Sequence, residues 1–159
     1  MKLEGSCHCQ AVRFSLESKT PYPFMVCYCS ICRKTGGGGG YAINIMGLAA
    51  TLRVEGMEHT GTYRALTEAG EESLNHRHFC ASCASALWIS NPSYAQWVYP
   101  FASAIDTPLP SPPRRERIME NYRPQWTRSG DESGDGHFPE YPPMGIEDWH
   151  RQNGLLEAD

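Results

Sequence analysis

Seven cysteines are the residues of this 159-residue sequence with the clearest capacity for chemistry. They fall in three closely spaced groups: Cys7 and Cys9; Cys27, Cys29 and Cys32; Cys80 and Cys83. Because seven is an odd number, disulfides would leave at least one thiol unpaired, so an oxidised secreted framework fits poorly. The pattern favours metal binding or reduced thiols.

The first and last groups together supply four thiols, which is the number of ligands in a structural zinc site. Cys80 and Cys83 have the spacing of a zinc knuckle, and Cys7 and Cys9 can form the other pair because alternate residues of an extended segment project to one side. A shared metal would tie the N-terminus to the middle of the chain across 70 residues (10–79). Metal binding worth on the order of 10 kcal/mol could then decide whether the domain folds. The alternative is that these are buried reduced cysteines.

The middle group supplies three thiols within six residues and has no obvious fourth ligand. Three protein ligands are typical of a reactive zinc whose open position accepts water or substrate. Three thiolates outweigh the charge of Zn²⁺, so this metal would be a weak generator of hydroxide and better suited to holding a soft sulfur substrate as thiolate. Arg33 and Lys34 follow directly and could offset the charge or bind a substrate carboxylate.

Three other interpretations of the middle group stay open from the sequence. Cys27 and Cys32, or another pair, could form a redox disulfide. A histidine such as His59, His76 or His78 could instead complete a second structural zinc site. The third possibility is that the site is empty.

Five glycines, 36–40, follow the middle group immediately. Such a run permits unusual backbone angles or a close approach of backbone N–H groups to a ligand, and a flexible loop is the alternative. The segment is not a phosphate-binding loop, because Lys and Ser/Thr are missing after the last glycine.

Short β-branched and aromatic segments predict that strands position these cysteines. The candidate strands are 11–16, 41–46, 51–54, 61–65, 86–89 and 96–101. A helical turn is expected at 30–34 and a short helix at 111–122, where Pro112 and Pro113 would be tolerated in the first turn. The predicted fold is therefore mainly β with few short helices.

The length indicates a single core, but the composition changes after Trp126. The Gly/Ser/Asp-rich stretch 129–136 has little apolar surface to bury and is predicted to be mobile. Apolar side chains then return: Phe138, Tyr141, Met144, Ile146 and Trp149. We therefore divide the chain into a zinc-binding domain, 1–126, and a linker with an aromatic C-terminal tail, 127–159. The tail, 137–150, could equally dock on the domain or bind a partner.

The charge balance and hydropathy argue against two classes of partner. A net charge of −4 gives no general attraction for nucleic acid, and the one basic cluster, at 114–117, is expected to be a solvated turn. The uncharged stretch 35–52 is long enough to suggest a membrane span, but its six glycines and Asn44 exclude one. No signal-peptide pattern is present near the N-terminus, so a reducing, cytoplasmic location is expected.

Taken in order, three motifs resemble the glutathione-dependent formaldehyde-activating enzyme family, which also includes centromere protein V. They are GSCHCQAVRF at 5–14, CYCSICRK at 27–34 and FCxxC at 79–83. The resemblance extends more weakly through 104–106 and 118–126, so it covers about 3–126. Ala84 stands where family members usually have Gly, so the turn there must accept a side chain or adopt another geometry.

The resemblance implies a compact Mss4-like β domain with two zinc sites. Carried over by position, the structural zinc would be held by Cys7, Cys9, Cys80 and Cys83, and the second zinc by Cys27, Cys29 and Cys32. The family's reaction joins formaldehyde to glutathione as S-hydroxymethylglutathione and is classed as a carbon–sulfur lyase activity. The first hypothesis is thus a zinc-dependent carbon–sulfur lyase acting on a glutathione adduct. The alternative is a non-catalytic zinc-binding module for a protein partner.

Overall fold

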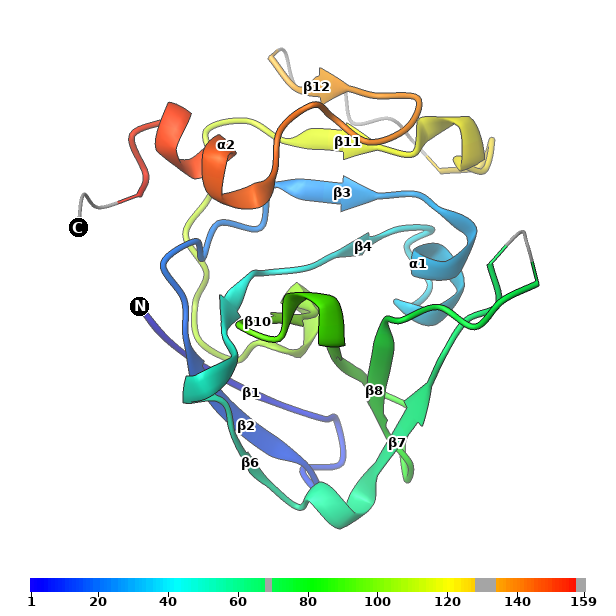
Figure 1. Cartoon of the computed structure of the whole chain (residues 1–159), viewed down its shortest axis with the longest axis vertical. Coiled ribbons are helices and arrows are strands. Elements are labelled where there is room, and N and C mark those ends of the chain that lie inside the picture. Colours follow the sequence, from blue (N-terminus) through cyan, green and yellow to red (C-terminus); the bar gives the residue numbers. More distant parts are fainter. Residues whose placement is uncertain (68–69, 128–133, 157–159) are drawn as a thin grey trace.

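The computed structural model describes residues 1–67, 70–127 and 134–156, and these residues build three small sheets (Figure 1). The N-terminal sheet is antiparallel with the order β1-β2-β6. Its strands are β1 (Lys2–Ser6), β2 (Arg13–Glu17) and β6 (Arg53–Glu55). Side chains of β1 and β2 alternate between exposed and buried, as expected when one face of a sheet covers a core.

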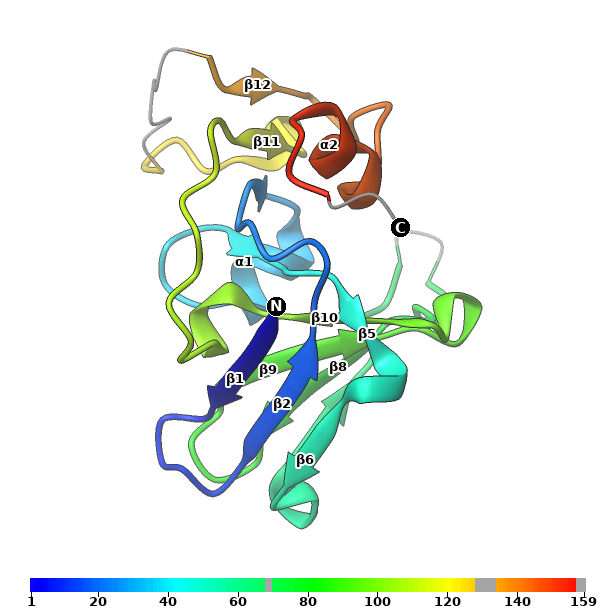
Figure 2. The same ribbon diagram turned by 90° about the vertical axis from the view of Figure 1, so that its left-hand side faces the viewer.

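The central sheet has five antiparallel strands in the order β5-β10-β9-β8-β7. They are β5 (Gly47–Leu48), β10 (Trp97–Pro100), β9 (Ala86–Ser90), β8 (His76–Cys80) and β7 (Thr60–Tyr63). The N-terminal sheet packs on it, with Phe14 of β2 edge-on to Trp88 of β9 at a centroid distance of 5.3 Å. Figure 2 shows β1 and β2 lying across β8, β9 and β10. Cys7 belongs to the same core cluster as Phe14 and Trp88, so the core between these sheets extends to the N-terminal cysteines.

The third sheet has the order β12-β11-β3-β4 and occupies one end of the molecule (Figure 1). Its strands are β12 (Gly136–His137), β11 (Glu116–Ile118), β3 (Met25–Cys27) and β4 (Ala42–Ile43). The pairs formed by β11 with β12 and with β3 are parallel, so this sheet joins three segments that are far apart in the sequence.

Two short α-helices and five 3₁₀ turns complete the described chain. The helices are α1 (Ser30–Thr35) and α2 (Ile146–Gln152). The 3₁₀ turns are Ala49–Thr51, Met57–His59, Pro92–Tyr94, Ala102–Ala104 and Glu120–Tyr122. No helix in the described ranges has both the length and the apolar character needed to cross a membrane.

The predicted fold class is confirmed, and most of the candidate strands coincide with observed ones. The helical turn expected at 30–34 is α1. The helix expected at 111–122 is wrong, because that segment contains β11 followed by a 3₁₀ turn. Pairing on both sides, with β3 and β12, fixes residues 116–118 in an extended conformation, and local propensity cannot anticipate such distant partners.

The basic cluster at 114–117 is also not the solvated turn that its charges predict. Arg117 is buried in β11, where its guanidinium forms an ion pair with Asp135 at 2.9 Å and donates a hydrogen bond to the Tyr28 hydroxyl at 3.0 Å. Glu116 is buried beside it and accepts a hydrogen bond from Trp149 Nε1 at 3.0 Å. These charges are tolerated inside the protein because each has a partner.

The aromatic tail docks on the domain. Trp149 of α2 is 1% exposed and stacks on Phe24, with ring centroids 3.8 Å apart. The linker expected to be mobile, 129–136, lies mostly outside the described residues, which resume at Gly134. From there the chain forms β12, passes the end of β11 and returns to α2 (Figure 1).

Candidate metal centres

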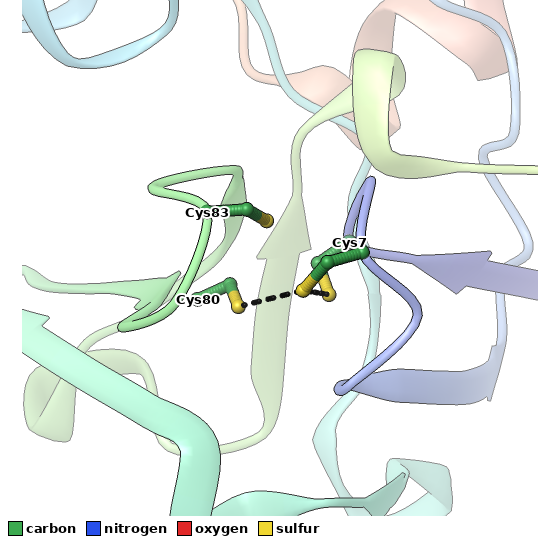
Figure 3. Close-up of side chains that lie close together, drawn as sticks. Cys7, Cys80 and Cys83 are labelled. Carbon is green, nitrogen blue, oxygen red and sulfur yellow. Dashed lines mark hydrogen bonds between the residues drawn. The ribbon is translucent and has the colours of Figure 1, made fainter.

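Four thiols from two distant segments meet at one end of the central sheet. Cys7 and Cys9 lie in the loop after β1, Cys80 is the last residue of β8, and Cys83 lies in the turn before β9. All four Sγ atoms lie within 4.8 Å of one another. Figure 3 shows Cys80 and Cys83 facing Cys7 across the gap between the two segments. The structure thus brings together the four residues predicted to share one metal.

The four-cysteine group fits a structural zinc ion. Tetrahedral Zn–S bonds place neighbouring sulfurs about 3.8 Å apart. The Cys7–Cys9 and Cys9–Cys80 sulfur separations are 3.5 and 3.7 Å. Cys7 and Cys80 are fully buried, and Cys7 Sγ accepts a hydrogen bond from the Val12 N–H at 3.3 Å. Hydrogen bonds of this kind orient a thiolate ligand before a metal binds.

Local hydrogen bonds also favour the thiolate that a metal requires at Cys83. The Ser85 hydroxyl lies 3.2 Å from Cys83 Sγ. This contact, together with nearby backbone N–H groups, lowers the pKa of Cys83 to about 5. These hydrogen bonds therefore favour the ionised form of Cys83, which is the form that binds a metal.

Each of the two knuckles in this group ends in a residue of positive φ, although the hydrogen bond that closes the turn spans three residues in one and four in the other. The N–H of Gln10 donates to the Cys7 carbonyl at 3.0 Å, and the N–H of Ala84 donates to the Cys80 carbonyl at 2.8 Å. Both residues adopt positive φ, 63° for Gln10 and 59° for Ala84. The left-handed conformation of residue 84 explains why Gly is usual at that position. This chain keeps the conformation although Ala84 carries a Cβ atom.

Ala84→Gly is expected to raise the free energy of unfolding by about 1 kcal/mol, because it removes the clash that Cβ makes in the left-handed conformation. Ala81→Gly in the same turn is the matched control, since Ala81 has no positive φ. That change is expected to be neutral or destabilising. Urea unfolding of the zinc-loaded variants measures both, and a gain from Ala81→Gly equal to that from Ala84→Gly would contradict the argument.

The second group consists of Cys27, Cys29 and Cys32, whose Sγ atoms also lie within 4.8 Å of one another. Cys27 ends β3, Cys29 is the N-cap of α1 and Cys32 lies on the buried face of that helix. Cys29 Sγ accepts the Cys32 N–H at 3.3 Å, so the thiol takes the part that Ser or Asp usually plays at a helix start. The end of a strand and one helical turn thus position the three cysteines of the C-x-C-x-x-C motif.

Hydrogen bonding inside this group selects one thiol for ionisation. Contacts from the Cys27 and Cys32 side chains, together with the Cys32 N–H, lower the pKa of Cys29 to about 2. The same contacts and burial raise the pKa of Cys27 above its ordinary value. Among the three thiols, hydrogen bonding therefore favours ionisation most at Cys29.

Both metal-binding groups found among the described residues contain only cysteines. The histidines considered as a further ligand, His59, His76 and His78, belong to neither group. His59 is exposed beside Glu58, while His78 stacks on Trp88 and contacts the hydroxyls of Thr62 and Ser90. All seven cysteines are free. The geometry thus favours neither a histidine-completed second site nor a disulfide.

Arg77 is the cation that the structure places at the three-cysteine group. Its guanidinium, on β8, donates to Cys32 Sγ at 3.8 Å and to Thr35 Oγ1 at 3.4 Å. The side chain is buried, so its charge acts in a medium of low dielectric constant. Sequence reasoning missed this residue; the available signal was an arginine three positions before Cys80 in an otherwise β-like segment. Of the cations predicted for this role, Arg33 is half-buried and Lys34 is exposed on α1.

Two cavities adjoin the metal-binding groups: one includes Cys7 in its lining, and the other includes Arg77, which contacts Cys32. The polar cavity, of about 500 Å³, includes Ser6, Gln10, Ser85, Ser103 and Asp106 in its lining. The apolar cavity, of about 320 Å³, includes Tyr63, Arg77, Phe79 and Phe101. Thr35, Ala84 and Ala86 line both cavities. Arg77, which contacts Cys32, thus also lines the apolar cavity, and a ligand of a few hundred Å³ has space beside this arginine.

The glycine run has a structural explanation at both of its ends. A Cβ at Gly36 would lie 2.8 Å from the Cys32 carbonyl oxygen, which accepts the Gly36 N–H at the end of α1. Gly40 has φ +80°, and a Cβ there would meet Thr127 and Trp126. Gly36 and Gly37 also line the polar cavity. The run thus combines close packing with a position beside a candidate ligand site.

The family model of the glutathione-dependent formaldehyde-activating enzymes matches residues 2–121. The chain belongs to this family. A protein of Halomonas elongata, provisionally named a glutathione-dependent formaldehyde-activating enzyme, is 54% identical over 158 residues, which cover 99% of this chain and all of that protein. The family match ends before β12 and α2, whereas the likeness to the Halomonas protein extends through them.

A crystal structure of a Rhodobacter sphaeroides protein shares the fold, with a TM-score of 0.53. The two sequences are 20% identical, and the superposition covers 87% of this chain and 99% of that chain. At this identity the likeness concerns the architecture alone. It supports the mainly β fold described above.

Proposed function

We propose that this chain is a zinc-dependent carbon–sulfur lyase that acts on S-hydroxymethylglutathione or a related glutathione conjugate. The observation that carries the proposal is the difference between the two thiol groups. One has four sulfurs and is complete as a structural site, whereas the other has three sulfurs, a buried arginine beside it and adjoining cavities. An incomplete ligand set next to ligand-sized space is typical of a catalytic metal site. Membership of the family agrees with a glutathione substrate.

In this proposal the structural zinc is held by Cys7, Cys9, Cys80 and Cys83, and the second zinc by Cys27, Cys29 and Cys32. When bound at the second group, zinc supplies an open coordination position that favours a sulfur ligand in its thiolate form. The remaining work falls to the chain's own side chains, which bind and orient the substrate and adjust the charge around its sulfur.

The reaction requires control of charge on sulfur and oxygen. In the direction of synthesis, the glutathione thiolate forms a bond with the aldehyde carbon, the carbonyl π electrons move to oxygen, and that oxygen takes a proton. The reverse breaks the carbon–sulfur bond and returns the electron pair to sulfur. Arg77 offsets negative charge on the sulfurs in both directions, and the apolar wall formed by Phe79 and Phe101 limits access of water to the reacting carbon.

The peptide part of glutathione has two kinds of candidate partner, one in the polar cavity and one in the residues directly after Cys32. The polar cavity offers hydroxyls and the Asp106 carboxylate, which could receive the substrate's ammonium group. Arg33 and Lys34, directly after Cys32, are proposed to bind a substrate carboxylate. In support, the buried Arg33 Nε has no hydrogen-bond partner among the residues that the structure describes.

Zinc stoichiometry with and without glutathione tests the proposal directly. We expect about two zinc ions per chain, one of which becomes labile when glutathione is added, and faster exchange between formaldehyde and its glutathione adduct in NMR exchange spectra. A single inert zinc and an unchanged exchange rate would contradict the enzyme. That result would favour the alternative, a non-catalytic zinc-binding module.

A further inference from the structure

Tyr28 stands between the first two thiols of the three-cysteine group and is held at both ends by β11. The residue is fully buried. Its N–H donates to the Ile118 carbonyl at 3.1 Å, and its hydroxyl accepts a hydrogen bond from Arg117 Nη1 at 3.0 Å. Because Cys27 and Cys29 are its neighbours in the chain, a fixed Tyr28 restricts the two planar peptide units that connect these thiols.

The guanidinium of Arg117 is itself fixed by a buried carboxylate. Asp135 Oδ2 accepts a hydrogen bond from Arg117 Nε at 3.0 Å and lies 2.9 Å from Nη2. The other carboxylate oxygen, Oδ1, accepts the Arg115 N–H at 2.8 Å. The side chains of Arg117 and Asp135 are only 7% and 2% exposed. A planar guanidinium held at two of its nitrogens has a fixed orientation, so the third nitrogen, Nη1, points at Tyr28 in a fixed direction.

Asp135 belongs to a part of the chain that the family model, which ends at residue 121, does not match. It directly precedes β12, which pairs in parallel with β11 and donates the Gly136 N–H to the Arg115 carbonyl at 2.8 Å. Strands β12, β11 and β3 are therefore neighbours in one sheet (Figure 1). Through these contacts the C-terminal segment, 134–156, reaches the three-cysteine group.

We propose that Asp135, Arg117 and Tyr28 are positioning residues for the three-cysteine group, so that the C-terminal segment sets how tightly the second zinc is held. The inference rests on the second zinc of the proposed function. When thiols are held in place before a metal arrives, less conformational freedom is lost on binding and the affinity is higher. A buried, charge-assisted network suits this purpose, because its hydrogen bonds are stronger than those between neutral groups.

The test compares Tyr28→Phe and Asp135→Asn with the control Trp149→Phe. Tyr28→Phe removes only the hydroxyl that Arg117 contacts, and Asp135→Asn removes the charge that orients the guanidinium. The control also removes a buried hydrogen bond of the C-terminal segment, from Trp149 Nε1 to Glu116, but this bond does not involve Tyr28. Competition of each zinc-loaded protein with a chromophoric chelator measures the zinc affinities of both sites. Circular dichroism and thermal unfolding verify that each variant is folded.

Tyr28→Phe should weaken binding of the second zinc about three- to tenfold, which is the effect of losing one hydrogen bond, and Asp135→Asn should weaken it at least as much. The zinc at the four-cysteine group is the internal reference and should keep its affinity in both variants. Both zinc affinities of Trp149→Phe should stay unchanged. The double variant should lose no more than Asp135→Asn alone, because both changes break the same network.

Three results would overturn the inference: an unchanged second zinc in Tyr28→Phe, an equal loss in Trp149→Phe, or additive losses in the double variant. If Asp135→Asn does not fold, Tyr28→Phe and Trp149→Phe decide between the outcomes. A single zinc in the unchanged protein, insensitive to glutathione, would instead overturn the proposed function, and with it this inference.

Discussion

Cys80→Ser is expected to prevent folding, whereas Cys29→Ser should remain folded and lose its activity. Cys80 is fully buried at the end of β8, and its sulfur belongs to the group that joins β8 to the N-terminal loop. Zinc bound by four thiols contributes about 10–16 kcal/mol at neutral pH, which equals or exceeds the whole stability of a typical domain. Removing one of its ligands should therefore leave little folded protein.

Cys29→Ser separates metal binding from helix capping, because Cys29 is also the N-cap of α1. A serine hydroxyl can accept the Cys32 N–H as the thiol does, so the helix start is preserved while a soft metal ligand is lost. Far-UV circular dichroism and zinc content distinguish the two variants: we expect no native spectrum for Cys80→Ser and a native spectrum with about one zinc for Cys29→Ser. Equal loss of structure in both would refute the division into a structural and a reactive site.

Arg77→Met is expected to lower the rate of adduct formation about tenfold to a hundredfold. The change removes a buried positive charge and its hydrogen bond to Cys32 while it preserves much of the side-chain volume. Hydrogen bonds to charged groups contribute about 1.5–3 kcal/mol, which corresponds to this range of rates. Steady-state kinetics at saturating and limiting glutathione measures the effect on binding and on turnover.

Arg77→Lys is the matched control, since it retains the charge and loses the planar, forked donor. It should recover part of the activity that Arg77→Met loses. If the two variants are equally impaired, packing rather than charge is the contribution of Arg77. If neither is impaired, the arginine does not act on the reacting sulfur.

The cysteine spacing was sufficient to predict which thiols meet within each short motif, whereas the meeting of Cys7 and Cys9 with Cys80 and Cys83 was predicted from the four ligands that a structural zinc requires. In C-x-C and C-x-x-C segments, the covalent geometry of a strand end or a tight turn forces the sulfurs together, and the structure contains both predicted groups. The mainly β fold was also predictable, because alternating apolar residues in β2 and aromatic residues in β9 and β10 are local signals. These parts depend on residues close together in the sequence.

The sequence-based predictions are wrong where residues far away in the sequence determine the local structure. The segment 111–122 satisfies local rules for a helix, but pairing with β3 and β12 makes residues 116–118 a strand. Arg117 was expected in solvent and is buried because Asp135 and Tyr28 compensate its charge. Neither partner is near it in the sequence, so no local pattern could reveal the pairing.

The sequence by itself determined the short cysteine motifs and therefore the class of chemistry available, since ligand type and short spacing are local properties. Only the tertiary structure decided what surrounds those thiols. Arg77 comes from β8, 45 residues from Cys32 along the chain. It reaches the thiols although β8 and β3 belong to different sheets, because a contact between remote segments is fixed by the packing of the whole domain rather than by any segment alone.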